Sequence, residues 1–462
     1  MAAKKRSLWN LSERFEGDKV VWIIALMLIL MSIVCIFSST SRLVDANADR
    51  VDFFKHQLII VAVGLGLMII CYSIKSINFF RTVSKWCFPL SFVLLLMLDA
   101  HVNIGSVITT PNINGANRIL QIMGFQLHVF EVVKVAMVMY LAWAMDAHKK
   151  KELKGNFSDK VKKILYVYAP FLITFVMILP GSNSSALFIG AIMFVTILLG
   201  GGNMKDMLLL AAAGISALLL CFGVYKISNG KAFGRIGTAI SRIFDDDDNE
   251  AKFLAARKGS KDYYDALDAI RQPVSARIAI KEGGLIGKGP GQSTQRYVVP
   301  DMPEDYMYSF IIEEYGLLGG ILVIFLYVSL LARGAIIARN CGKDMFAKLA
   351  VAGLCILITS QAFLHMFVNA DIGIMTGQTL PLISHGKSAF LCFSIAFGII
   401  LSFSRIASRR IDAETNGAVP LVDLEEVEVK PAEKPVRDTE DILDDLEMFE
   451  TEGISQDIED YE

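Results

Sequence analysis

The chain has 462 residues, of which 54% are hydrophobic and 20% charged, and its mean hydropathy is +0.49. A soluble protein carries about 25% charged residues and interrupts its apolar positions at the amphipathic period, so this composition excludes an ordinary soluble globule. The net charge of −2 hides a division, because residues 411–462 hold 19 acidic and 3 basic residues while the first 410 residues carry a net charge of +14.

Apolar runs recur along the chain, each near the length of about 20 residues that a helix needs to cross a bilayer. They predict an all-α, polytopic membrane protein, since a spanning segment must satisfy its own backbone hydrogen bonds and no period-two barrel pattern occurs. The predicted spans, about ten in number, are 20–40, 56–74, 84–99, 126–146, 164–180, 184–200, 206–226, 306–333, 346–368 and 386–405.

Lysine and arginine set the predicted orientation. The connection from His148 to Lys163 holds seven lysines, and basic residues also follow the eighth and tenth spans and precede the first. The positive-inside rule makes these segments, and both termini, cytoplasmic.

Five parts follow from this orientation. They are a cytoplasmic N-terminus (1–19), membrane helices one to seven (20–227), a large extracytoplasmic loop (228–305), membrane helices eight to ten (306–410) and an acidic, disordered cytoplasmic tail (411–462). Long loops are uncommon without a function, so the loop 228–305 is where we expect chemistry.

The outer loop ends in GGLIGKGPGQSTQRYVVPDMPEDYMYSFIIEEYGLLGG. Its spacing excludes a P-loop, and its backbone NH groups with Lys281 and Lys288 could hold an oxyanion, or it could be a plain hairpin. Asp301, Glu304 and Asp305 follow where the chain re-enters the membrane. A carboxylate at the edge of low dielectric suits general-base work, although these acids could simply mark the aqueous boundary. The run Asp245–Asp248 earlier in the loop is predicted to be a solvated loop.

Two further groups of polar residues lie near or within spans. His128, Glu131 and Lys134 share one helix face, and Glu131 and Lys134 can pair, as a structural ion pair or as part of a wet cavity. The stretch MTGQTLPLISHGKSAF (375–390) breaks any continuous helix and is predicted to be a broken or re-entrant element lining a cavity. No spacing typical of a metal site occurs, so no metal ligands are predicted.

Three stretches together resemble the SEDS family (shape, elongation, division and sporulation). The family elements GAxRW…FQPSE..K, GGLxGKGxGxS…LPExHTDFIFA…EELG and TGxxLPxISYGGSS read here GANRI…LHVFEVVK, GGLIGKGPGQS…PDMPEDYMYSF…EEYG and TGQTLPLISHGKSA. The resemblance spans Gly17 to Arg405 and implies the SEDS fold. The N-terminal GDKVVW…CIFSSTS and the long cytoplasmic tail resemble the septal branch of the family more than the elongation branch.

The resemblance implies a peptidoglycan glycosyltransferase that polymerises lipid II into glycan strands during septal wall synthesis, at the division septum in the bacterial cytoplasmic (inner) membrane. Alignment back from the shared EE pair places the family's essential aspartate on Asp305, the implied catalytic base. The implied substrate-binding residues are Arg118, Glu131, Lys134, Gln272, Ser275, Arg277, Lys288 and Ser384. Arg118, Arg277, Lys281, Lys288 and Arg296 are candidates for the departing pyrophosphate.

No cofactor is implied with certainty, although a divalent cation (Mg²⁺ or Mn²⁺) could share the pyrophosphate. The implied partners are a class B penicillin-binding protein that crosslinks the strands, other division proteins, lipid II and the undecaprenyl-pyrophosphate-linked glycan. No nucleic acid is implied.

Four departures from the family pattern put fine substrate contacts in question. Ile119 replaces Trp, Phe130 replaces the Ser beside Glu131, and His385 and Lys387 replace Tyr and Gly. Two other functions stay open. Ten helices with intramembrane Glu131 and Lys134 would also suit a lipid II flippase or transporter, and the acidic tail would suit a non-catalytic division scaffold.

Overall fold

The computed structural model describes residues 16–39, 50–103, 105, 107–113, 116–228, 246–299, 302–372 and 376–415. The described helices up to the outer loop are α2 (Lys19–Ser39), α3 (Arg50–Ser73), α4 (Ile77–Asp99), α5 (Val129–Lys149), α6 (Asp159–Lys163), the π-helical η2 (Ile164–Tyr168), α7 (Ala169–Ile178), α8 (Asn183–Leu199) and α9 (Met204–Ile227). The helices that follow are α11 (Asp246–Ala255), α12 (Lys261–Gly283), the 3-10 turn η3 (Gln295–Tyr297), α13 (Met302–Asp305), α14 (Met307–Asn340), α15 (Met345–Asn369) and α16 (Lys387–Thr415).

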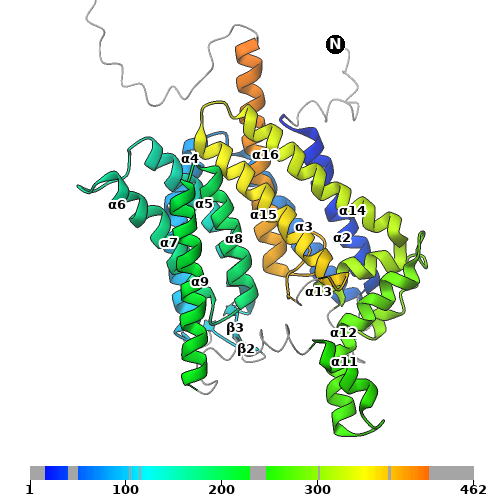
Figure 1. Cartoon of the computed structure of the whole chain (residues 1–462). Coiled ribbons are helices and arrows are strands. Elements are labelled where there is room, and N and C mark those ends of the chain that lie inside the picture. The colour runs from blue at the N-terminus through cyan, green and yellow to red at the C-terminus, as the bar shows by residue number, and fades with distance from the viewer. Residues whose placement is uncertain are drawn as a thin grey trace, which may run out of the picture. The chain divides into compact units, whose positions relative to one another are not determined.

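The predicted helical membrane fold is confirmed. Among the described residues, eight helices are long and apolar enough to cross a membrane, one of them made of α6, η2 and α7 in succession. The 17-residue α8 and the charge-bearing α5 complete the ten predicted spans. Figure 1 shows these helices side by side in one bundle.

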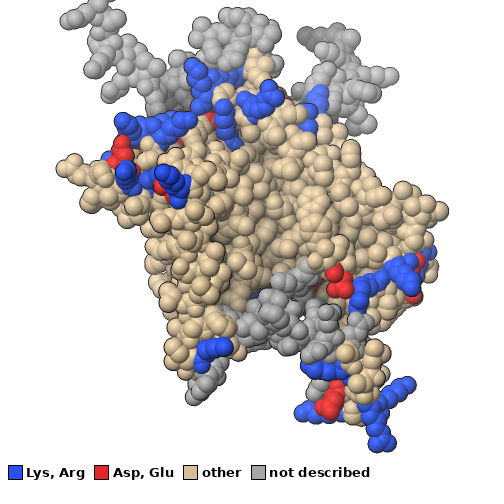
Figure 2. Space-filling view, in the orientation of Figure 1, with Lys and Arg blue, Asp and Glu red and all other residues tan. Residues whose placement is uncertain are grey.

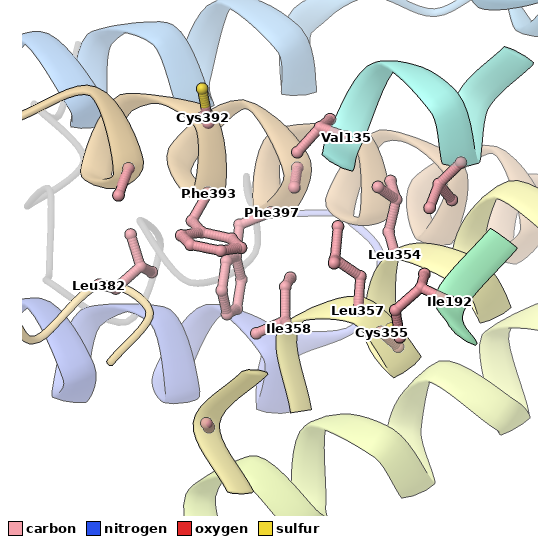
Figure 3. Close-up of a cluster of buried hydrophobic side chains, with 14 of the residues drawn as sticks. Val135, Ile192, Leu354, Cys355, Leu357, Ile358, Leu382, Cys392, Phe393 and Phe397 are labelled. Carbon is pink, nitrogen blue, oxygen red and sulfur yellow. The ribbon is translucent and has the colours of Figure 1, made fainter. Parts of the chain in front are cut away.

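The centre of the bundle lies where α5, α8, α15 and α16 meet. Val135, Ile192, Leu354 and Phe393 come from these four helices and pack together (Figure 3). Around this centre α3 packs on α16, α14 on α15, and α12 on α14. Apolar residues fill the interior as in a soluble core, so the polar side chains found there need partners within the protein.

A small sheet precedes α5, which the hydropathy pattern did not predict. It has the order β1 (Ile108–Thr109), β4 (Ile119–Ile122), β5 (Phe125–His128), and a separate pair joins β2 (Asn112–Ile113) to β3 (Ala116–Asn117). In the β4–β5 hairpin Ile122 pairs with Phe125, and both intervening residues, Met123 and Gly124, have positive φ. Positive φ at both central positions is the type I′ turn that matches the twist of a hairpin. The fourth span was therefore placed wrongly at its start, because residues 126–128 are strand.

The segment between α15 and α16 is broken, as predicted. Residues 376–386 are not helical, and Gln378, Leu380, Ile383 and Ser384 within them are buried. Backbone of this kind is tolerated at membrane depth only where protein surrounds it. We call residues 376–386 the broken element.

The lysines and arginines of the predicted cytoplasmic connections gather at one end of the bundle (Figure 2). Contacts there join segments far apart in sequence: Arg333 Nε donates to Asp18 Oδ2 at 2.7 Å, and Asp18 N donates to Ser404 Oγ at 2.6 Å. Arg81 of α4 reaches both Asp344 (2.8 Å) and Asp146 (3.3 Å). A second basic group lies on α11 and α12, at the other end.

Several predicted boundaries fall on residues that the structure does not describe, including 1–15, 229–245, 300–301 with Asp301, and 416–462. Where residues are described, α16 continues to Thr415, five residues into the predicted tail. The predicted solvated loop at Asp245–Asp248 is wrong for its last three residues, because Asp246 begins α11. Acidic residues favour the first turn of a helix, which explains the difference.

Candidate functional site

Asp305 ends the four-residue helix α13, immediately before α14. It is half-buried, and the next residue, Tyr306, has φ −123° and ψ 26°, which interrupts the helix. The carboxylate lies against the broken element: a Cβ placed on Gly377 would be 3.4 Å from Asp305 Oδ2. Gly377, which has no side chain of its own, therefore lies beside this carboxylate.

Glu131 and Lys134 lie at the start of α5 and pair as predicted. Lys134 Nζ donates to Glu131 Oε1 (2.6 Å), Gln361 Oε1 (2.7 Å) and Gln378 Oε1 (2.8 Å). These three bonds use all three ammonium protons, and the Lys134 side chain is 1% exposed. Glu131 Oε2 is buried and has no hydrogen-bond partner among the residues that the structure describes, so one carboxylate oxygen can still accept a hydrogen bond.

Gln378 joins the two groups. It accepts from Lys134, donates to Ser185 Oγ of α8 (3.2 Å), and directly follows Gly377, which contacts Asp305. The three stretches that the sequence singled out thus meet in space, at the end of the bundle opposite the basic connections. Gln361, Gln378 and Ser185 were not among the predicted site residues. Glutamines inside apolar spans were the signal that could have pointed to them.

The glycine-rich turn at the end of the outer loop (GGLIGKGPGQ) does hold carboxylates, but they are side chains of this protein and not of a ligand. Glu313 Oε1 accepts from Lys288 Nζ (2.8 Å) and from the backbone N of Thr294 (2.8 Å), and Ser293 Oγ donates to Glu313 Oε2. Glu314 Oε1 accepts from the backbone N of Gly291 (3.0 Å) and from Ser38 Oγ (2.6 Å). Both glutamates are buried.

The same turn is bonded to the backbone of α14 at a break in that helix. Gly316 has φ 71° and ψ −175°, and the freed groups pair with the turn: Leu317 N donates to Gly284 O, and Lys288 N donates to Glu313 O, each at 2.9 Å. We call residues 283–295 with 313–318 the glycine clasp. Backbone approaches this closely only where no Cβ intervenes: a Cβ on Gly287 would lie 2.3 Å from Glu314 O.

Lys288 and Arg296, two candidate pyrophosphate cations, lie within this clasp. Burial opposes the charged form of Lys288, but its hydrogen bonds to Glu282 and Glu313 outweigh burial and raise its pKa above the usual value. Arg296 is buried and donates to Ser38 O (3.0 Å) and Gly291 O (2.7 Å). Both cations are therefore engaged by the protein.

The other predicted binding residues are spread over the same end. Arg118 Nε donates to Gly181 O (3.2 Å), and Arg277 Nε lies 3.3 Å from Asp371 Oδ2 at the surface. Gln272 is half-buried and Ser275 buried, both on α12. The hydroxyl of Ser384 accepts from the backbone N of Leu380 (2.9 Å) and so caps its own turn.

The four residues that depart from the family pattern fall into two groups. Ile119, Phe130 and His385 are buried, whereas Lys387 is exposed at the start of α16. His385 Nδ1 lies 2.9 Å from Gln57 Oε1, and burial lowers the pKa of His385 to about 4. His385 is thus an uncharged part of the interior.

The fold and this site define a class: a multi-pass membrane protein with a half-buried carboxylate at one end of its bundle, beside a buried ion pair. The family model described as cell cycle protein, which covers FtsW, RodA and SpoVE, matches residues 18–409. The chain belongs to this family, the SEDS family.

Relatives and solved structures agree with this membership. The chain is 27% identical to the probable peptidoglycan glycosyltransferase FtsW of Geobacter metallireducens, over 86% of this chain and 96% of that protein. It is 26% identical to stage V sporulation protein E of Bacillus subtilis, over 85% and 98%. A chain from a peptidoglycan synthase complex that coordinates polymerization and crosslinking has the same fold (TM-score 0.59, 19% identity, 85% and 98% covered). So does RodA of Thermus thermophilus (TM-score 0.54, 19% identity, 84% and 97% covered).

Proposed function

We propose that this protein is a peptidoglycan glycosyltransferase that polymerises lipid II into glycan strands during septal cell-wall synthesis. The observation that carries the proposal is the Asp305 carboxylate, half-buried at the end of the bundle opposite the basic connections and next to Gly377 of the broken element. The names of the FtsW relatives support the activity.

The reaction joins an acceptor sugar hydroxyl to the anomeric carbon of a lipid-linked donor. The hydroxyl oxygen forms the new C–O bond, its proton passes to Asp305, and the bond from the anomeric carbon to the pyrophosphate breaks, so that undecaprenyl pyrophosphate leaves. A general base contributes about 10²–10⁴-fold to such a step. The donor is anchored in the outer leaflet, so its reacting carbon lies near the level at which α13 enters the bundle.

Positive charge must meet the departing pyrophosphate. We propose Arg118 for this role, because it lies in the GANRI element just before α5, at the same end of the bundle as Asp305. Its Nε donates to Gly181 O, which places the guanidinium next to the start of α8.

A divalent cation is not assigned a site on the protein. The described residues hold no group of three or more His, Cys, Asp or Glu side chains that could bind a metal ion. A divalent cation carried by the pyrophosphate itself would need no such group, so its participation stays a prediction.

The partners we propose are a class B penicillin-binding protein, which would crosslink the strands, and other division proteins. The structural neighbour from a peptidoglycan synthase complex supports the first of these. We place the protein in the bacterial inner membrane at the division septum, and we propose that residues 416–462 contribute to recruitment there.

The test uses the full-length protein with its transpeptidase partner in proteoliposomes that contain labelled lipid II. We expect wild type to form glycan chains, and Asp305→Ala to form none while still binding the partner. A wild-type protein that moves lipid II between leaflets without polymerising it would refute the proposal in favour of transport.

A further inference from the structure

The backbone around Asp305 is held by side chains of α15, which no sequence element pointed to. In a continuous helix the N–H of Ser309 would donate to the carbonyl of Asp305, four residues earlier. That bond is not formed here, and the side-chain amide of Asn369 bridges the two backbone groups instead. Ser309 N donates to Asn369 Oδ1 (2.9 Å), and Asn369 Nδ2 donates to Asp305 O (3.0 Å).

His365, one turn earlier on α15, accepts a hydrogen bond from the adjacent backbone N–H. Tyr308 N donates to His365 Nε2 (3.3 Å), so Nε2 is the unprotonated nitrogen and Nδ1 carries the proton. Nδ1 then donates to Gln378 O at 2.7 Å. The first amides of a helix lack partners within it, and Tyr306 supplies no side-chain cap to α14. The cap comes from α15 instead.

These two side chains therefore hold the two segments of the candidate site in place, the main chain at Asp305 and the broken element. Asn369 holds the main chain of Asp305, and His365 holds Gln378, whose neighbour Gly377 lies against the Asp305 carboxylate. Asn369 is 0% and His365 1% exposed, so water does not replace these bonds.

We propose that Asn369 is a positioning residue for Asp305, with His365 as the second support. The proposal rests on the proposed function only for its effect on rate. Asn369 touches no reacting atom. It acts by holding the main chain at Asp305 in its non-helical turn, so that the Asp305 carboxylate stays beside Gly377. A misplacement of about 1 Å can cost about 100-fold in rate.

The variant is Asn369→Leu, which has similar volume but no hydrogen-bonding group. The matched control is Thr359→Val, which removes one buried hydrogen bond from the same helix, to Tyr327 O at 3.2 Å, away from α13. In polymerisation of labelled lipid II, Asn369→Leu should lower kcat about 100-fold with KM changed less than about threefold. Thr359→Val should leave both within about threefold. His365→Asn keeps one donor and one acceptor and should retain more activity than His365→Leu.

A second readout needs no catalysis. A Cβ on Gly377 would lie 3.9 Å from Asp305 Cγ, so Asp305→Cys with Gly377→Cys should form a disulfide, mapped by peptide mass spectrometry in the full-length protein. Adding Asn369→Leu should reduce its yield several-fold, and adding Thr359→Val should not. This arm reports geometry even if Asp305 proves not to be the base, so the two failures are distinguishable.

Loss of both rate and crosslink in Asn369→Leu supports the proposal. An unchanged crosslink in Asn369→Leu, or equal losses in Thr359→Val, overturns the positioning role. A lost crosslink with an unchanged rate overturns the role of Asp305 as the base instead.

Discussion

At the residue scale, Lys134 shows how a cation is accommodated at membrane depth. Its three protons meet one carboxylate and two amide oxygens, and every partner comes from a different part of the chain. A buried charge of this kind is tolerated because its geometry is complete, and removing one partner costs far more than the pair contributes.

The two members of the pair should therefore respond differently. Lys134→Met leaves the Glu131 carboxylate and two glutamine oxygens buried without a donor, so we expect a loss of about 3–5 kcal/mol in stability. Glu131→Gln keeps an acceptor for Lys134 and should cost less. Thermal unfolding of both variants in detergent measures this, and equal midpoints would contradict the assignment.

His385 provides a prediction about pH. Its pKa in the folded protein is lowered by burial to about 4, below the usual value of about 6.5, so the unfolded chain binds the extra proton in this interval. Its contribution to stability is complete above pH 6.5 and is lost as the pH falls toward 4. His385→Gln cannot take up that proton, so its unfolding midpoint should fall less than that of wild type between pH 7 and 4.5. Parallel curves for the two proteins would show that His385 titrates normally.

At the element scale, the glycine clasp joins the outer loop to the break in α14. Gly287 and Gly291 both have positive φ, of 93° and 79°, but only Gly287 faces neighbouring backbone. An added methyl at Gly287 would meet Glu314 O at 2.3 Å, whereas no atom of the described part of the chain comes within 4 Å of a Cβ on Gly291.

Alanine at these two positions therefore separates conformational strain from collision. Gly291→Ala should cost about 1–2 kcal/mol, the cost of a left-handed conformation in an L-residue. Gly287→Ala should lower the unfolding midpoint further and weaken glycan synthesis, because the clasp must open. Equal effects of the two substitutions would argue against the clasp.

How far these elements could be predicted depended on the range of the interactions that form them. Runs of about 20 apolar residues set the helices locally, so each predicted span overlaps a helix. The ends were predicted less well: α4 begins seven residues before its predicted span, and α14 and α16 end seven and ten residues after theirs. The β4–β5 hairpin was missed because its strands are four residues long and the second was absorbed into an apolar run. Only part of the glycine clasp was predicted. The turn does surround carboxylates, as expected for an oxyanion, but these carboxylates come from α14.

At the scale of the whole molecule, the two ends of the bundle have different tasks. At the basic end, Asp18 bonds to Arg333 of α14 and Ser404 of α16, and its Oδ1 caps α2 through Val20 N (2.9 Å). At the other end Asp305, Gly377 and the Lys134 network meet. The sequence placed these motifs in order along the chain, but the bonds from Asn369 and His365 join residues about 60 positions apart, which no local pattern encodes.

This division predicts that stability and activity can be separated. Asp18→Ala removes a helix cap and an ion pair, so it should cost about 1–2 kcal/mol in stability. Because the site lies at the opposite end, kcat measured well below the unfolding midpoint should stay within about twofold of wild type. A large fall in kcat at that temperature would show that the two ends are coupled.

The most direct test compares two neighbouring acids on α13. Asp305→Asn keeps shape and removes the base, whereas Glu304→Gln makes the same chemical change at the exposed neighbouring residue. With labelled lipid II and the transpeptidase partner, the rate of glycan chain formation should fall about 10²–10⁴-fold in Asp305→Asn and stay within about threefold in Glu304→Gln. Glycan synthesis by Asp305→Asn within tenfold of wild type would contradict the assignment of Asp305 as the base.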